Sequence, residues 1–374
     1  MRNKIGFTSA FTILSLVLIG LLLTAGTSAA ASQDQPTISK DSIQVTAFTD
    51  NFYQKNFDIW SWLPSLEFRV NGPIGSGSQI YAEFTLPGKG TWVKFDCSTD
   101  ETQAGDTMHT TCGGRDIPGG DDKSSTYTGP VSFAIKMRNE LAGTDTTLFT
   151  GKLKVAKAHS NEAQTPKFVN HFVYYVDHDW NLPIGYVFLT PESQRGWDRP
   201  DFHVAFWVRG DPYNFQPHLF YQGKEVGKIF FEGDEVGKSS CESELDNSTT
   251  HYVEDSMPQK AKWSRVICSF PNIKGLDKTG EKPGMFGPLY VLSQNPGDYE
   301  FKLLWNNHLA RSIKFKAGPD GIVDNGIASA NKLGSKRVIV PVQIIGDQDG
   351  LWDKTAWKAD AFYGNPLTGF TPVP

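Results

Sequence analysis

The chain has 374 residues, and its 36 lysines and arginines against 41 aspartates and glutamates give a net charge of −5. No basic run is longer than Lys336-Arg337, which argues against a nucleic-acid partner because a phosphate-binding surface normally carries a larger basic patch. The content of 36 glycines, 22 prolines and 13% aromatic residues favours many short strands joined by tight turns.

Residues 1–30 have the order of a secretory signal peptide. Arg2 and Lys4 precede an apolar run at 11–23, and Ser28-Ala29-Ala30 offers small residues for cleavage. The alternative is an uncleaved anchor, although the apolar core is short for a membrane span. Removal of the signal leaves 34 − 41, a net charge of −7. We therefore expect a secreted or periplasmic protein with no membrane span after signal cleavage.

An approximate repeat follows the signal. The sequence FRVNGP at 68–73 resembles FWVRGDP at 206–212, and each half contains two of the four cysteines. An even cysteine count in an exported chain implies two disulfides, for which three pairings exist. The repeat favours the local pairs, Cys97–Cys112 and Cys241–Cys268. The alternative is that β-sandwiches in general share this degree of similarity.

The stretch YYVDHDWNLP contains the most suggestive cluster of acids. In a strand, Asp177 and Asp179 would share one face and could hold a cation, while His178 would face away. The alternative is a polar loop that follows a strand. The chain has no His-Glu-x-x-His and no Gly-x-Ser-x-Gly sequence, so a hydrolase would have to draw its acids from Asp177, Asp179 or Glu192.

Two polar and aromatic loops, at 195–203 and 211–218, flank the predicted strand around Trp207. Aromatic rings beside Asp, Asn and Arg stack on sugars and also form protein contacts. The alternative is that these rings plug the ends of a sandwich. The candidate ligand-binding residues are Trp180, Trp197, Asp198, Arg199 and Tyr213. Asn247 begins an Asn-Ser-Thr glycosylation sequence, which matters only in a host that uses it.

Residues 295–318 alternate apolar and polar side chains on both sides of Asn306-Asn307, which predicts a β-hairpin because Asn tolerates a positive φ. The sequence PGDYEFKLLWNNHLARSIKFKA resembles the last two strands of bacterial immunoglobulin-like domains. The resemblance concerns the fold alone. The cysteine spacing does not fit the disulfide and tryptophan of antibody domains.

The segment after residue 318 departs from the repeat. A Gly- and Asn-rich connector leads to a predicted strand at 337–345, which Pro341 would place at a sheet edge or at a bulge. Asp347, Asp349 and Asp353 match part of a calcium-loop spacing, although the first Asp and the final Glu are missing. The alternative is an ordinary turn that uses Asp and Gly locally.

The sequence therefore predicts an all-β protein of two tandem immunoglobulin-like or jelly-roll sandwiches, each with one disulfide. We expect the signal at 1–30, the sandwiches at 31–160 and 161–318, and a linker and strand-bearing tail at 319–374. The favoured function is non-catalytic binding of an extracellular protein or glycan through sandwich-end loops. The alternatives are a carbohydrate-active hydrolase and a cell-surface protein that self-assembles through an unpaired strand edge. No cofactor is expected apart from calcium.

Overall fold

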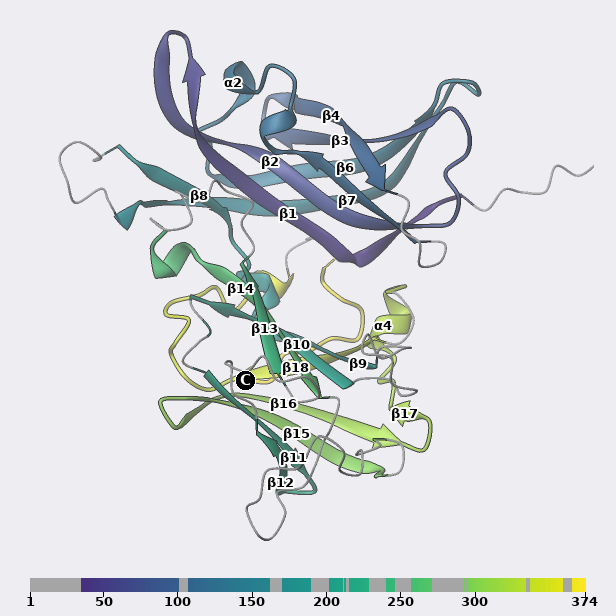
Figure 1. Ribbon diagram of the computed structural model, residues 1–374, viewed down its shortest axis with the longest axis vertical. Coiled ribbons are helices and arrows are strands. Elements are labelled where there is room, and N and C mark those ends of the chain that lie inside the picture. The colour runs from purple at the N-terminus through teal and green to yellow at the C-terminus, as the bar shows by residue number, and fades with distance from the viewer. Residues whose placement is uncertain are drawn as a thin grey trace, which may run out of the picture.

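A computed structural model describes most of the chain after residue 34 and shows a nearly all-β protein. Figure 1 shows two units, with strands β1 to β8 in one and β9 to β18 in the other. The described residues are 35–100, 107–161, 170–189, 202–210, 212, 215–228, 240–245, 257–270, 292, 295–333, 337–358 and 365–374.

The first unit is one antiparallel sheet with the order β1-β2-β5-β4-β3-β6-β7-β8. Side chains alternate between core and solvent along its strands, so one face of the curled sheet encloses the core. The strands are β1 (Thr37–Gln54), β2 (Phe57–Asn71), β3 (Ser78–Leu86), β4 (Gly90–Asp100), β5 (Thr107–Gly113), β6 (Gly129–Asn139), β7 (Thr144–His159) and β8 (Phe172–Val176). The helices η1 (Gly114–Asp116) and α2 (Gly120–Lys123) follow β5.

A threonine side chain connects β1 and β8, the first and last strands of this sheet. The buried hydroxyl of Thr49 on β1 donates to the carbonyl of Tyr174 on β8 at 3.1 Å and accepts the N–H of the same residue at 2.9 Å. A threonine side chain therefore satisfies two backbone groups where the two strands have no ladder between them.

The second unit contains two sheets that are connected through one strand. The order is β12-β11-β15-β16-β18-β9-β10-β14-β13, and β17 pairs with β16. The strands are β9 (Ile184–Leu189), β10 (Phe202–Arg209), β11 (Phe215–Tyr221), β12 (Lys224–Lys228), β13 (Ser240–Leu245), β14 (Trp263–Phe270), β15 (Gly297–Trp305), β16 (His308–Gly318), β17 (Gly321–Ile322) and β18 (Arg337–Ile344). Four short helices accompany them, η4 (Asp179–Asn181), η6 (Gln259–Ala261), α4 (Ile327–Ala330) and η8 (Ala356–Lys358).

Strand β18 belongs to both sheets of the second unit. Its residues 337–341 pair with β9, and its residues 342–344 pair with β16. Pro341 lies at the changeover, where it forms the last pair with β9. Each part of β18 therefore has a ladder partner on one side in the described pairings, and the proline marks the change of partner. The expectation that this strand offers an edge stays a prediction.

Two boundaries differ from those expected from the sequence. Strand β8, expected in the second sandwich, pairs with β7 and completes the first sheet. Strand β18, expected in a tail, lies inside the second unit. Strand β8 pairs with the strand directly before it in the chain, whereas the pairing of β18 with β9 joins distant segments, which local sequence patterns do not reveal.

The expected disulfides and hairpin are confirmed. Cys97 bonds to Cys112 across β4 and β5, and Cys241 bonds to Cys268 across β13 and β14. The turn between β15 and β16 has φ values of 48° and 64° at its two asparagines. Among the described residues, no helix is long and apolar enough to cross a membrane.

Candidate binding surfaces

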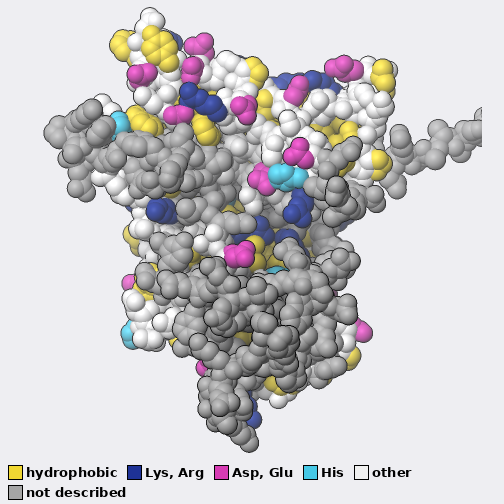
Figure 2. All heavy atoms as spheres, viewed as in Figure 1, with side chains coloured by type: hydrophobic (Ala, Val, Ile, Leu, Met, Phe, Trp, Pro, Cys, Tyr) yellow, Lys and Arg dark blue, Asp and Glu magenta, His cyan; other side chains and the backbone are white. Residues whose placement is uncertain are grey.

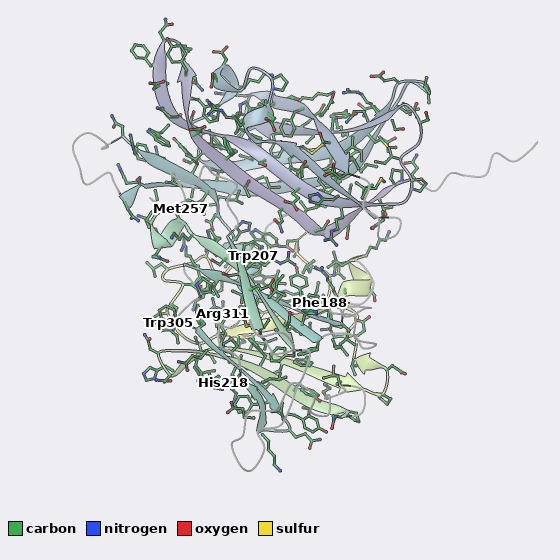
Figure 3. The ribbon with its side chains drawn as sticks, viewed as in Figure 1. Phe188, Trp207, His218, Met257, Trp305 and Arg311 are labelled. Carbon is green, nitrogen blue, oxygen red and sulfur yellow. A yellow bond between two sulfur atoms is a disulfide. The ribbon has the colours of Figure 1, made fainter. Side chains whose placement is uncertain are left out.

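The acidic stretch that follows β8 lies where the two units meet. All five residues from Asp177 to Asn181 are buried, and the last three form the helix η4. Figure 3 shows Trp207 and Met257 in the same region between the units. The stretch is a turn that follows a strand, as the polar-loop interpretation predicted, so Asp177 and Asp179 do not share a strand face.

Most oxygen atoms of the two carboxylates already accept hydrogen bonds. Asp177 accepts from Lys154 Nζ at 3.0 Å and from the backbone N–H of Asp179 at 3.1 Å. Asp179 accepts the N–H of Asp353 at 2.7 Å, which joins this turn to the C-terminal segment. Burial raises the pKa of Asp179, and the nearby Asp177 raises it further. The hydrogen bond from the Asp353 N–H opposes this shift, as do the charges of Arg209 and Lys154.

Aromatic rings enclose the histidine of this turn. The ring of His178 stacks on Trp207 with centroids 4.6 Å apart, and it makes a T-shaped contact with Trp263 at a centroid distance of 5.8 Å. Trp180 is also buried and packs in the core. Its ring therefore fills the interior and presents no exposed platform for a ligand. The remaining predicted residues of this group lie outside the described residues, namely Glu192, Trp197, Asp198, Arg199, Tyr213 and Asn247.

The three aspartates of the predicted calcium loop have separate roles. Asp349 is buried, pairs with the guanidinium of Arg311 and accepts the N–H of Arg209 at 2.8 Å. Asp353 accepts hydrogen bonds from the N–H and hydroxyl of Thr355, whereas Asp347 is exposed. The described part of the chain contains no group of three or more His, Cys, Asp or Glu side chains that could hold a metal ion.

The tip of the β1–β2 hairpin is a further candidate surface, which was not predicted from the sequence. Tyr53 and Phe57 are 56% and 69% exposed there, on either side of a turn at Lys55 and Asn56. We call these four residues the tip surface. Figure 2 shows hydrophobic side chains gathered at this tip, which stands out from the first unit. The signal in the sequence was the Lys-Asn turn between two alternating strands.

The hairpin is held in place below its tip. Asp50 pairs with Arg115, whose guanidinium lies 5.3 Å from the centroid of the Phe52 ring. The amide of Gln54 donates to the carbonyl of Ser124 at 2.8 Å. Asp50, Phe52 and Gln54 alternate along β1, so these contacts tie one face of the hairpin to η1 and to the end of α2 and support the tip from that side.

Comparisons with known proteins found no matching family model, no similar curated protein and no similar solved structure.

Proposed function

We propose that the chain is a non-catalytic binding protein that acts outside the cytoplasm and contacts a protein partner through the tip surface. The main observation in support is that Tyr53 and Phe57 are exposed at the tip of a hairpin that is held in place by other contacts. Large aromatic side chains contribute much of the energy of protein contacts when a partner buries them. The two disulfides are compatible with an oxidising compartment.

The register of the hairpin favours a protein over a glycan as the partner of the tip. Tyr53 pairs with Asp58, and Phe57 pairs with Gln54 in the next row. Because successive rows point to opposite faces, the two aromatic rings lie on opposite sides of the hairpin. A sugar-stacking platform needs rings on one face, whereas a wedge with a ring on each side fits a groove in a protein.

The hydrolase alternative receives less support from the site. Asp177 and Asp179 are only 9% and 7% exposed, and three of their four oxygen atoms accept hydrogen bonds. An enzyme needs two carboxyl groups that converge on a substrate. Their bonded oxygen atoms instead hold the turn after β8 and connect it to Asp353 in the C-terminal segment.

The test is a double substitution, Tyr53→Ala with Phe57→Ala, in the full chain. We expect loss of binding to surface and extracellular proteins of the host, with unfolding free energy within about 1 kcal/mol of the wild type. The matched control replaces two exposed apolar residues outside the tip with Ala, Leu141 and Leu351, which are 81% and 98% exposed. Equal binding by the tip variant and the control would contradict the proposal. A glycan array run in parallel detects a sugar partner, which would contradict the choice of a protein.

A further inference from the structure

Acidic side chains accompany the aromatic residues of the tip surface. Tyr53 pairs directly with Asp58 across the hairpin, so the carboxylate and the tyrosine ring project from the same face. Both side chains are exposed. Phe57 pairs with Gln54 in the next row and therefore projects from the opposite face. One side of the hairpin thus presents an aromatic ring next to a carboxylate.

The side of Phe57 is the side on which α2 packs. The amide of Gln54 donates to the carbonyl of Ser124 at 2.8 Å, and Ser124 directly follows α2. This helix carries Asp121 and Asp122, and both of their side chains are exposed. Figure 1 shows α2 beside the hairpin. The second side of the hairpin therefore also has carboxylates close to its aromatic ring.

These carboxylates are not neutralised by the described cations. In the described part of the chain, no lysine, arginine or histidine forms an ion pair with Asp58, Asp121 or Asp122. The neighbouring Asp50 differs, because Arg115 pairs with it. The exposed acids at this end of the first unit therefore keep their charge available to a partner.

The balance of charge at this end is negative. The segments 50–58 and 114–123, which form the hairpin tip, η1 and α2, contain three lysines or arginines and five aspartates, a net charge of 3 − 5, or −2. The whole chain has a net charge of −5. Figure 2 shows acidic side chains beside the hydrophobic ones at the tip.

A partner that buries the two aromatic rings brings its own rim close to these carboxylates. The rim of a protein interface is polar and stays accessible to solvent. Lysine and arginine side chains on the partner's rim would be attracted to the aspartates, whereas acidic side chains would be repelled. Charges on a rim mainly set the rate of association and the choice of partner, while buried aromatic rings supply most of the strength.

We propose that the partner of the tip surface is a protein with an apolar groove that is rimmed by lysine or arginine side chains. This inference rests on the proposed function, because it names the chemistry of the partner of that same surface. The groove receives the rings of Tyr53 and Phe57. The basic rim lies against Asp58 on one side of the hairpin and against Asp121 and Asp122 on the other.

The probe is the set of extracellular proteins of the source organism, divided on a cation-exchange column near neutral pH. Each fraction is passed over the immobilised wild-type chain and over the tip variant, and binding that only the wild type shows depends on the tip. We expect this binding in the retained, basic fraction. Tip-dependent binding in the unretained fraction alone would overturn the inference and leave the proposed function standing. Its absence from both fractions would overturn both.

Charge variants of the full chain then test the acidic rim against the protein isolated from the retained fraction. Asp121→Asn with Asp122→Asn should slow association about threefold or more at low salt and leave dissociation nearly unchanged. Asp121→Glu with Asp122→Glu should keep the wild-type rate. The matched control, Asp320→Asn with Asp347→Asn, removes the same charge from exposed positions in the second unit and should also keep it. Equal association rates for the two Asn variants would overturn the inference.

The dependence on salt gives a readout that needs no variant. Added salt should slow the association of the wild-type chain, because exposed charges are screened within about 10 Å at 0.1 M salt and within about 3 Å at 1 M. The dissociation rate, which depends on the buried rings, should change less. A wild-type association rate that does not change with salt would overturn the basic rim whether or not the variants fold.

Discussion

The buried ion pair between Arg311 and Asp349 makes a strong prediction about stability. The side chain of Arg311 is 0% exposed and that of Asp349 is 2% exposed. Figure 3 shows Arg311 inside the second unit. Replacement of Asp349 by Ala leaves a buried guanidinium without its counter-charge, which typically costs about 3–5 kcal/mol. The N–H of Arg209 also loses its acceptor, which adds about 1–3 kcal/mol.

We therefore expect Asp349→Ala to lower the free energy of unfolding by at least about 4 kcal/mol, a large part of the 5–15 kcal/mol typical of folded domains. Equilibrium unfolding in urea, followed by tryptophan fluorescence, measures the change. The control is Asp347→Ala, which removes an exposed carboxylate two residues away and should change stability by less than about 0.5 kcal/mol. A loss below about 1 kcal/mol for Asp349→Ala would refute the reasoning.

The same two variants test the calcium loop predicted from the sequence. Each is unfolded once with millimolar calcium and once with a chelator. If Asp347 and Asp349 bound one ion, both variants would lose stability in calcium and the effect would vanish in chelator. The ion pair with Arg311 instead predicts a loss for Asp349→Ala that is equal in both conditions.

Three further outcomes follow from burial and packing. Burial lowers the pKa of His203 to about 4, so near that pH the folded state binds fewer protons than the unfolded state. The free energy of unfolding should therefore fall by about 3 kcal/mol as the pH drops from about 6.5 to 4. An NMR titration that gives His203 a pKa near 6.5 would contradict this. Burial raises the pKa of Asp179, so its contribution to stability is present below its unfolded value near 3.8 and is lost as the pH rises through the folded value. The stability of Asp179→Asn relative to the wild type should therefore increase with pH in urea unfolding, and a constant difference would contradict the assignment. Gly151→Ala places a methyl group 2.7 Å from the ring of Phe133 and should cost about 1–3 kcal/mol in the same assay, whereas Gly227→Ala, with its nearest atom at 3.7 Å, should cost less than half as much.

Features that depend on local pattern were predictable. Alternation on both sides of Asn306-Asn307 predicted the β15–β16 hairpin, because the turn requires two residues that accept a positive φ. The two cysteine pairs were predictable because each joins neighbouring strands within one half of the chain. The all-β architecture followed from the same periodicity.

Long-range partners were not predictable. Arg311 lies in an ordinary alternating strand, and nothing near it in the sequence indicates that its counter-charge is 38 residues away at Asp349. The sequence around Asp179 has the composition of a solvent-exposed turn. In the structure its buried carboxylate accepts the N–H of Asp353, which is 174 residues away in the chain. Polar side chains can be buried when such hydrogen-bond partners exist. The polarity of the sequence alone therefore could not distinguish an exposed loop from a buried turn between the two units.

The double membership of β18 also sets an order of events during synthesis. One side of β9 has no ladder partner until β18 emerges, about 150 residues later in the chain. At a synthesis rate of about 5–20 residues per second, this delay lasts roughly 8–30 s. The first sheet contains all of its strands by Val176, so none of its ladders waits for β18. The nascent second unit thus carries an open, apolar strand edge for many seconds, and in this interval a chaperone or an export factor has the most to shield.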